Sequence, residues 1–307
     1  MRKAFSTTLA ELAERDPRIM LLTGDLGFMA LEPFADRFPD RFINMGVAEQ
    51  NMVGVGTGLA ESGFIPFLYS IVTFASMRAY EFIRNGPIMQ NLPVRIVGVG
   101  GGFEYGSAGP THYGLEDVGL MRIQPGMTVI APADHQQTRT ALLKSWDLPR
   151  PVYYRLGKDD RTVVPHLDGR FELGRAAVIG NGSDILFITM GAIASEVLAA
   201  VEMLAQRRVG CTVIVVSSFN PDPTADLLEV LSQFPLALTV EAHYREGGLG
   251  SMVAEIVADH GLRCKTVRCG VRTTPSGLTG SQAYLQERHG LSRRALVETA
   301  LQLLVEA

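Results

Sequence analysis

The chain has 307 residues, of which 47% are hydrophobic and 20% charged, and its formal net charge is −4. This length favours two domains of ordinary globular composition, and the weak negative charge gives no electrostatic basis for binding nucleic acid or an anionic membrane. No uncharged apolar stretch approaches the roughly 20 residues that span a bilayer. The three cysteines lack CxxC spacing and argue against a disulfide framework or a zinc site, so a reducing cytoplasm is the simplest expected location.

Short apolar runs alternate with stretches of helical periodicity along the whole chain. Nearly continuous apolar runs are typical of strands buried on both faces of a parallel sheet. The expected strands are Ile19–Thr23, Phe42–Met45, Ile65–Tyr69, Val94–Val99, Val129–Ala131, Val152–Arg155, Ile185–Met190, Thr212–Ser217, Ala237–Glu241 and Lys265–Arg268. Helices are expected near residues 3–15, 48–62, 73–84, 134–146, 193–208, 224–233, 250–260 and 291–304. This alternation predicts doubly wound α/β architecture.

The apolar rhythm is interrupted once, near residues 158–175. Charged residues fill 158–161, and proline and glycine follow at Pro165 and Gly169. We therefore expect two doubly wound domains, over residues 1–162 and 175–307, joined by a linker over 163–174.

Glu49 is the first candidate for chemistry, within the heptad GVAEQNM at residues 46–52. It begins the expected helix 48–62, where the helix dipole favours a carboxylate. That helix is apolar or small-sided on nearly every face, which predicts burial and suits a subunit interface. A carboxylate at its start is partly desolvated, which favours the protonated form unless it is paired. Glu49 can thus be a catalytic proton carrier or simply a helix-start carboxylate.

His112 is the second candidate, in a loop between Gly109-Pro110 and Gly114. A histidine in such a loop can donate to a substrate oxygen, or it can be an ordinary solvated side chain. No second His, Cys or carboxylate stands at ligand spacing, so a metal site is not expected there.

Further candidates lie on or beside the expected strands. Ile71, Phe74 and Met77 form an apolar stripe that is typical of core as well as of a cofactor pocket. Arg155 closes a strand and can face a ligand crevice or pair with a carboxylate. The glycines of HYREGGLG, residues 243–250, permit a tight strand-to-helix turn, and the helix start they precede can bind an anion.

Taken in order, these segments resemble the transketolase family, specifically the C-terminal half that some bacteria encode as a separate subunit. The likeness covers nearly the whole chain. It rests on residues 24–26, 46–52, 74–80, 83–85, 109–122, 125–134, 151–157, 240–243, 247–250 and 290–294. It implies that the first domain binds the aminopyrimidine of thiamine diphosphate and that the second is a transketolase C-terminal domain, interpreted as an assembly element.

The resemblance implies roles around the cofactor. Glu49 would hydrogen-bond N1′ of the aminopyrimidine and shuttle its proton, which promotes loss of the thiazolium C2 proton. Phe74 would stack on the pyrimidine ring, with Ile71 and Met77 lining the same pocket. Asp25 would lie near the thiazolium side.

It also implies roles toward substrate. His112 would donate to carbonyl or hydroxyl oxygens, and Arg155 and Arg2 would meet an anionic group at the far end. Three positions depart from the family pattern, which has an acidic residue, a Ser and a His where Ala108, Met29 and Gly100 stand. These departures imply an altered acceptor that is deoxygenated, unphosphorylated, or phosphorylated but held by other residues.

The Gly-Asp-Gly…Asn signature for diphosphate and metal is missing. The resemblance therefore implies that thiamine diphosphate lies between this chain and an N-terminal, diphosphate-binding subunit that mainly holds Mg²⁺ or Ca²⁺, in an α2β2 assembly. The expected activity is transfer of a two-carbon ketol unit from a ketose to an aldose, only with that partner. The alternatives are the E1 β subunit of a 2-oxo acid dehydrogenase and a non-catalytic relative. The GPTH loop favours transketolase over the E1 alternative.

Overall fold

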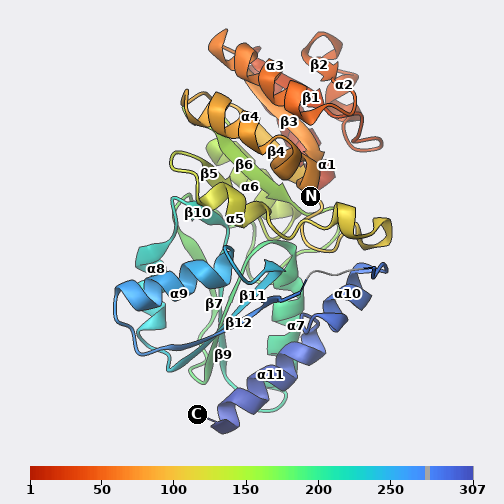
Figure 1. The fold of residues 1–307 in the computed structure, drawn as a ribbon. Helices are drawn as coiled ribbons and strands as arrows, with labels where there is room; N and C mark the ends of the chain where they lie inside the picture. Colours follow the sequence, from red (N-terminus) through yellow and green to blue (C-terminus); the bar gives the residue numbers. More distant parts are fainter. Residues whose placement is uncertain (274–276, 307) are drawn as a thin grey trace.

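Two α/β units, each with a central sheet between helices, lie one beyond the other along the molecule (Figure 1). The computed structural model describes residues 1–273 and 277–306. Residues 274–276 and Ala307, which fall within the expected second domain, lie outside the described residues. In the part of the chain that is described, no helix combines the length and apolarity needed to cross a membrane.

The first sheet has seven strands in the order β10-β5-β6-β4-β3-β1-β2. Its strands are β1 (Ile19–Thr23), β2 (Phe42–Asn44), β3 (Ile65–Ile71), β4 (Arg95–Val99), β5 (Thr128–Ile130), β6 (Val152–Leu156) and β10 (Ser218–Asn220). All neighbours pair in parallel except β10, which comes from the second half of the chain and runs antiparallel to β5. The two units thus share this sheet.

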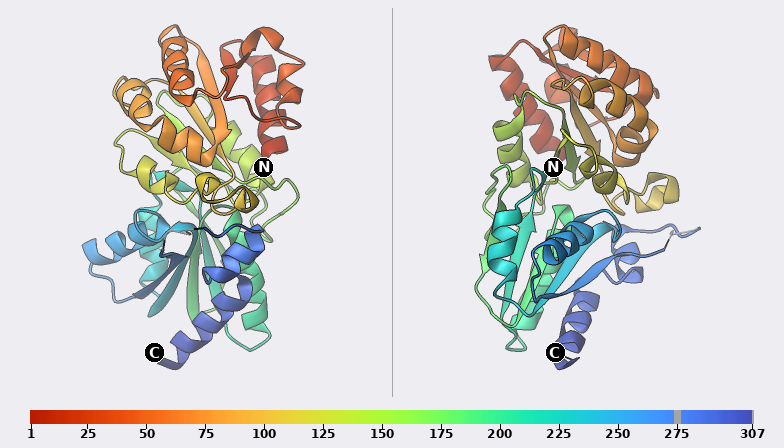
Figure 2. Two further views of the ribbon diagram at one scale, coloured as in Figure 1. Left: turned by 45° about the vertical axis from the view of Figure 1, so that its right-hand side comes forward. Right: turned by 60° about the vertical axis from the view of Figure 1, so that its left-hand side comes forward.

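Helices cover both faces of the first sheet (Figure 2). Leu21 and Phe67 pack with Phe5 on one face, whereas the next residues along the strands, Leu22 and Leu68, belong to the core on the other face. The first face carries α1 (Arg2–Arg15) and α6 (His135–Ser145), and the second carries α3 (Glu49–Glu61), α4 (Tyr80–Ile83) and α5 (Asp117–Arg122). Short elements are α2 (Glu32–Ala35), η1 (Pro39–Arg41), η4 (Gly106–Ala108) and η5 (Pro110–His112).

The second sheet has five strands in the order β12-β11-β8-β9-β7, with only β7 antiparallel to its neighbour. They are β7 (Ala176–Gly180), β8 (Ile185–Thr189), β9 (Cys211–Val216), β11 (Leu236–Tyr244) and β12 (Lys265–Val271). One face carries η6 (Gly191–Ile193), α7 (Ala194–Ala205) and α11 (Arg293–Glu306), and the other carries α8 (Thr224–Leu231) and α9 (Leu249–Asp259). Helix α10 (Gln282–Arg288) contacts η4 of the first unit.

This arrangement confirms the predicted α/β class with two mixed parallel sheets. The prediction of one helix over residues 73–84 is wrong. That stretch forms a π-helix η2 (Phe74–Arg78), then α4, and then a second π-helix η3 (Arg84–Ile88). Strands β7 and β10 and helix α10 were not expected from the sequence.

Candidate functional site

The carboxyl ends of β1, β3, β4 and β6 lie along one edge of the first sheet, where ligands bind in open α/β folds. Gly24 and Asp25 follow β1 there, and Gly100 follows β4. Glu49 begins α3, close enough that a β-carbon at Gly24 would lie 3.3 Å from its Oε1. The edge therefore brings several predicted site residues together.

Glu49 is only 1% exposed, and both carboxylate oxygens have partners. Ser70 Oγ donates to Oε1 at 3.0 Å, and Arg78 Nη1 donates to Oε2 at 2.6 Å. These contacts hold the buried carboxylate in one orientation. Met52 and Val53 bury one side of α3, but Gly54 and Gly58 are exposed. The chain by itself therefore buries only one side of this helix, and burial of the other side at a subunit interface stays a prediction.

Arg78 connects Glu49 to two of the predicted ring contacts. Its guanidinium carbon lies 4.2 Å from the centre of the Phe74 ring. The Phe74 ring in turn meets the His112 imidazole edge-on, with 5.1 Å between centroids and 70° between planes. His112 Nδ1 lies 2.9 Å from Thr111 Oγ1. A carboxylate, an aromatic face and an imidazole thus form one continuous cluster.

The remaining predicted cofactor residues flank this cluster. Ile71 ends β3 and is buried, whereas Met77 is 38% exposed on η2. Asp25 is exposed in the left-handed backbone region (φ 60°) and accepts from Asn44 Nδ2 at 2.9 Å. Asp25 therefore lies beside Gly24, on the Glu49 side of the edge.

Arg155 does not face the crevice. It is 5% exposed, its Nε donates to Asp117 Oδ2 at 2.9 Å, and its Nη2 donates to the carbonyls of Gly114 and Ala242. Pairing with a carboxylate was the alternative that the sequence left open, and it is the arrangement that the structure has. Arg155 joins the first unit to β11 of the second, so the predicted contact with a substrate anion has no support from its geometry.

Arg2 lies apart from the cluster, on a cavity of about 330 Å³ with Lys158, and its Nε donates to the Lys158 carbonyl at 3.3 Å. The Glu104 carboxylate lines the same cavity and accepts from the Lys158 N–H at 2.6 Å. Burial raises the pKa of Glu104 to about 7, and that hydrogen bond and nearby Arg155 offset the effect only partly. Asp159, Asp160 and Arg161 line the cavity as well, so Arg2 lies there among charges of both signs.

The three departures from the family pattern have different surroundings. A side chain at Gly100 would overlap the Tyr105 ring, and the Lys158 ammonium lies 4.5 Å from the centre of that ring. Tyr105 and Lys158 therefore occupy the space beside Gly100. Met29 is 84% exposed, and Ala108 is exposed at the end of η4.

The glycines of HYREGGLG serve an internal contact. Glu241 Oε2 accepts from the N–H of Leu249 at 2.7 Å, and its Oε1 accepts from the N–H of Gly250 at 2.8 Å. A β-carbon at Gly248 would overlap this carboxylate. The anion at the start of α9 is thus the chain's own glutamate, and close approach explains the glycine.

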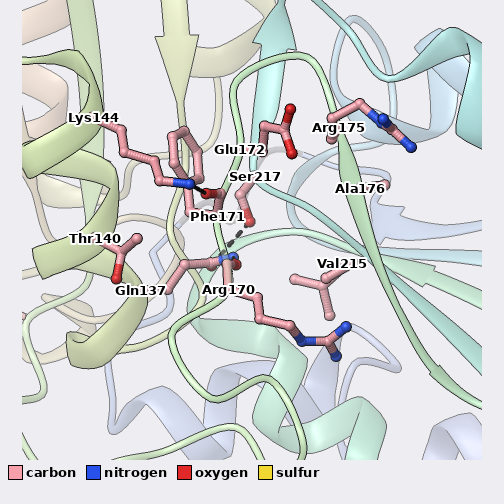
Figure 3. Close-up of a pocket in the computed structure, with 11 residues that line it drawn as sticks. Gln137, Thr140, Lys144, Arg170, Phe171, Glu172, Arg175, Ala176, Val215 and Ser217 are labelled. Atoms are coloured by element: carbon pink, nitrogen blue, oxygen red, sulfur yellow. Dashed lines mark hydrogen bonds between the residues drawn. The ribbon is translucent and has the colours of Figure 1, made fainter.

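A further cavity of about 380 Å³ lies between α6, the linker and the β7–β9 pair (Figure 3). Three cations line it, but each already has a partner. Lys144 donates to the Phe171 carbonyl, Arg170 to the His166 carbonyl, and Arg175 pairs with Asp226. These contacts brace the linker against both units, and none of the predicted site residues lines this cavity.

Two residues of the cluster were not predicted. Arg78 lies in a segment that carries the family resemblance, but its contact with Glu49 joins residues 29 apart in sequence and leaves no local pattern. Ser70 is the one small polar residue of strand β3, whose other members are Ile, Pro, Phe, Leu and Tyr. A polar residue inside a buried strand is the signal that could have indicated it.

The cluster around Glu49 fits a planar nitrogen heterocycle. A buried carboxyl can exchange a proton with a ring nitrogen, the Phe74 face can stack, and Gly24 leaves space beside Oε1. A divalent cation is a poorer fit, because residues 1–273 and 277–306 contain no group of three or more His, Cys, Asp or Glu that could hold a metal ion.

Family models match most of the chain. Residues 1–162 match the pyrimidine binding domain of transketolase, and residues 174–296 match its C-terminal domain. The chain therefore belongs to the transketolase family, which confirms the predicted resemblance. This membership supports thiamine diphosphate as the cofactor.

Three similar proteins are, by their names, parts of divided transketolases. An apulose-4-phosphate transketolase subunit from Phocaeicola vulgatus is 32% identical over 99% of this chain and 97% of its own length. A 6-deoxy-6-sulfo-D-fructose transketolase subunit, SqwH, from a Clostridium species is 34% identical over 98% and 93%. A split gene transketolase, solved as an inactive beta4 tetramer, superposes with a TM-score of 0.89, at 35% identity and over 99% and 98% of the two chains.

Proposed function

We propose that this chain is the pyrimidine-binding subunit of a two-component transketolase, which moves a two-carbon ketol unit from a ketose to an aldose. The observation that carries the proposal is the Glu49 carboxylate, which is 1% exposed and lies in one cluster with Phe74 and His112. Catalysis at a ring nitrogen needs a carboxyl with a fixed orientation in a dry site.

Each residue of the cluster has one task in this proposal. Glu49 carries a proton to and from the aminopyrimidine nitrogen, and Ser70 orients it through Oε1. Phe74 stacks on the pyrimidine, with Ile71 and Met77 beside it. Thiamine diphosphate, when bound, supplies the electron sink.

The polar residues of the loops act outside that ring pocket. His112 donates to a carbonyl or hydroxyl oxygen of the substrate, stabilising the charge that develops there. Asp25 stays near the thiazolium side, on the loop beside Gly24.

The diphosphate and its metal belong, in this proposal, to a partner subunit in an α2β2 assembly. Large exposed apolar side chains support such an interface. Phe28, Met29 and Val47 are 85%, 84% and 71% exposed on the loops after β1 and β2, and Phe82 on α4 and Met89 after η3 are exposed as well. Side chains of this kind, gathered at a site edge, are typical of protein–protein contacts.

We further propose an anionic sugar substrate. Both relatives act, by their names, on sugars that carry a phosphate or a sulfonate. Both sugars are ketoses, so the proposed anionic group belongs to the donor, and the acceptor types left open by Ala108, Met29 and Gly100 stay open. Arg2 is the proposed contact, with Lys158 beside it.

The proposal is tested by expressing the chain alone and with a diphosphate-binding subunit. We expect tight binding of thiamine diphosphate, and ketol transfer, only in the mixture with Mg²⁺ or Ca²⁺ present, because the isolated chain offers contacts to the pyrimidine ring alone. If the chain alone bound the cofactor and catalysed transfer, the division between two subunits would be wrong. Arg2→Ala should raise KM for anionic sugars and leave KM for neutral sugars unchanged.

A further inference from the structure

Arg78 contacts both side chains that the cofactor ring would need, Glu49 and Phe74. Its Nη1 donates to Glu49 Oε2 at 2.6 Å, and its guanidinium carbon lies 4.2 Å from the centre of the Phe74 ring. A ring that stacks on Phe74 while bonding Glu49 must enter the same space. The Arg78 guanidinium and the aminopyrimidine ring therefore compete for this space. Both are planar, and both can stack on an aromatic face.

The two sides of the ion pair differ in their freedom to move. The Glu49 side chain is 1% exposed, whereas the Arg78 side chain is 36% exposed. Ser70 bonds the other carboxylate oxygen, Oε1, and makes no use of the oxygen that Arg78 contacts. Since Arg78 ends η2 at the surface, its long side chain can leave toward solvent while the carboxylate stays in place.

Leaving Glu49 unpaired changes its chemistry. A buried carboxylate without a cation is disfavoured relative to the neutral carboxyl, which can donate to a ring nitrogen. Departure of the guanidinium would thus uncover Phe74 and prepare Glu49 as a proton donor in the same movement.

We propose that Arg78 is a gate for the pyrimidine site. Its side chain closes the site in the isolated chain and withdraws from Glu49 and Phe74 when the aminopyrimidine enters. The inference rests on the proposed function of Glu49. It adds that binding at this half of the site requires one side chain to be displaced, and it names that side chain.

The test is an NMR titration of the full chain with 4-amino-5-hydroxymethyl-2-methylpyrimidine, the ring portion of the cofactor alone. Arg78→Gln removes the competing charge, and we expect it to bind the ring about tenfold more tightly than the unsubstituted chain. Arg78→Lys keeps a charge for Glu49 but cannot cover Phe74 as a plane, so it should bind with intermediate affinity. Arg84→Gln is the matched control, because Arg84 is an exposed arginine of η3 that donates to Asn85.

The outcomes separate the gate from the site itself. Tighter binding by both Arg78 variants with unchanged binding by Arg84→Gln supports the gate, and Arg78→Lys decides alone if Arg78→Gln does not fold. Equal or weaker binding by the Arg78 variants, while Glu49→Gln loses binding, overturns the gate and leaves the proposed function standing. Unchanged binding by Glu49→Gln, or no binding by any variant, overturns the gate together with the role of Glu49.

Discussion

Arg155 and Asp117 form a buried ion pair at the junction of the two units, with 2.9 Å between Nε and Oδ2 and exposures of 5% and 1%. Tyr153 donates its hydroxyl to the same carboxylate at 2.8 Å. Arg155 also donates to the Ala242 carbonyl on β11, so one guanidinium joins the loop after His112 to the second sheet. The position of that loop therefore depends on a contact remote from the chemistry.

Removing one partner of this pair should be costly. Arg155→Ala leaves the Asp117 charge buried without its cation, and we expect the free energy of unfolding to fall by about 3–5 kcal/mol. Urea unfolding followed by circular dichroism measures this change. Arg18→Ala is the control, because Arg18 is exposed and its pair with Asp16 should contribute less than about 1 kcal/mol. Equal losses in the two variants would contradict the junction role.

Gly248 should tolerate no side chain, although its φ of −88° is accessible to every residue. The added methyl group of Gly248→Ala would displace the Glu241 carboxylate from the start of α9, which we expect to cost about 2–4 kcal/mol of unfolding free energy. Gly58→Ala is the matched change on α3, where nothing lies within 4 Å of the added atom. It should stabilise the isolated chain by about 0.5–1 kcal/mol. An unchanged free energy of unfolding in Gly248→Ala would refute the close-contact explanation.

Glu104 should make stability depend on pH. Burial raises its pKa from 4.5 to about 7, so between these values the folded chain binds more protons than the unfolded chain. The contribution of Glu104 to the free energy of unfolding is therefore fully present below pH 4.5 and is lost as pH rises through about 7. Glu104→Gln should remove this dependence. Between pH 4.5 and 8, its free energy of unfolding should rise by roughly 1–3 kcal/mol relative to that of the unsubstituted chain. Parallel stability curves for the two chains would contradict the shift.

The sequence predicts the sheet strands well because most of them are buried on both faces. Ile19–Thr23 is a continuous apolar run and forms β1 with the predicted bounds. Strand β7 has only one buried residue, and β10 has only three residues, so neither has a buried apolar run to recognise. Both are edge strands whose pairing is fixed by distant parts of the chain.

The candidate site is predictable only as a set of separate residues. Glu49 and His112 belong to recognisable segments, but Arg78 and Phe74 join them. The Arg78–Glu49 and Phe74–His112 contacts link residues that are 29 and 38 positions apart in sequence. The direction of Arg155 is likewise set by Asp117 and Ala242, which are 38 and 87 residues away in sequence. Side chains that meet across such separations leave no local pattern.

Glu49 should be essential in the assembled enzyme. Glu49→Gln keeps the size of the side chain but removes its proton exchange, and we expect ketol transfer and exchange of the cofactor C2 proton to fall at least about a hundredfold. Glu61→Gln, an exposed change at the other end of α3, should leave both rates unchanged. Proton exchange measured by NMR would separate the chemistry from assembly, since near-normal exchange in Glu49→Gln would sink the proposed role.

Phe28 should contribute to partner binding rather than to folding. It is 85% exposed, so Phe28→Asp removes little buried area and should leave the unfolding transition of the isolated chain unchanged. In the proposed assembly a charge there would be buried against the diphosphate-binding subunit, and we expect at least about tenfold weaker association. Val305→Asp is the matched control, because Val305 is 89% exposed on α11, in the second unit. Sedimentation analysis of the mixed subunits distinguishes the two positions, and equal association by both variants would remove the loop after β1 from the interface.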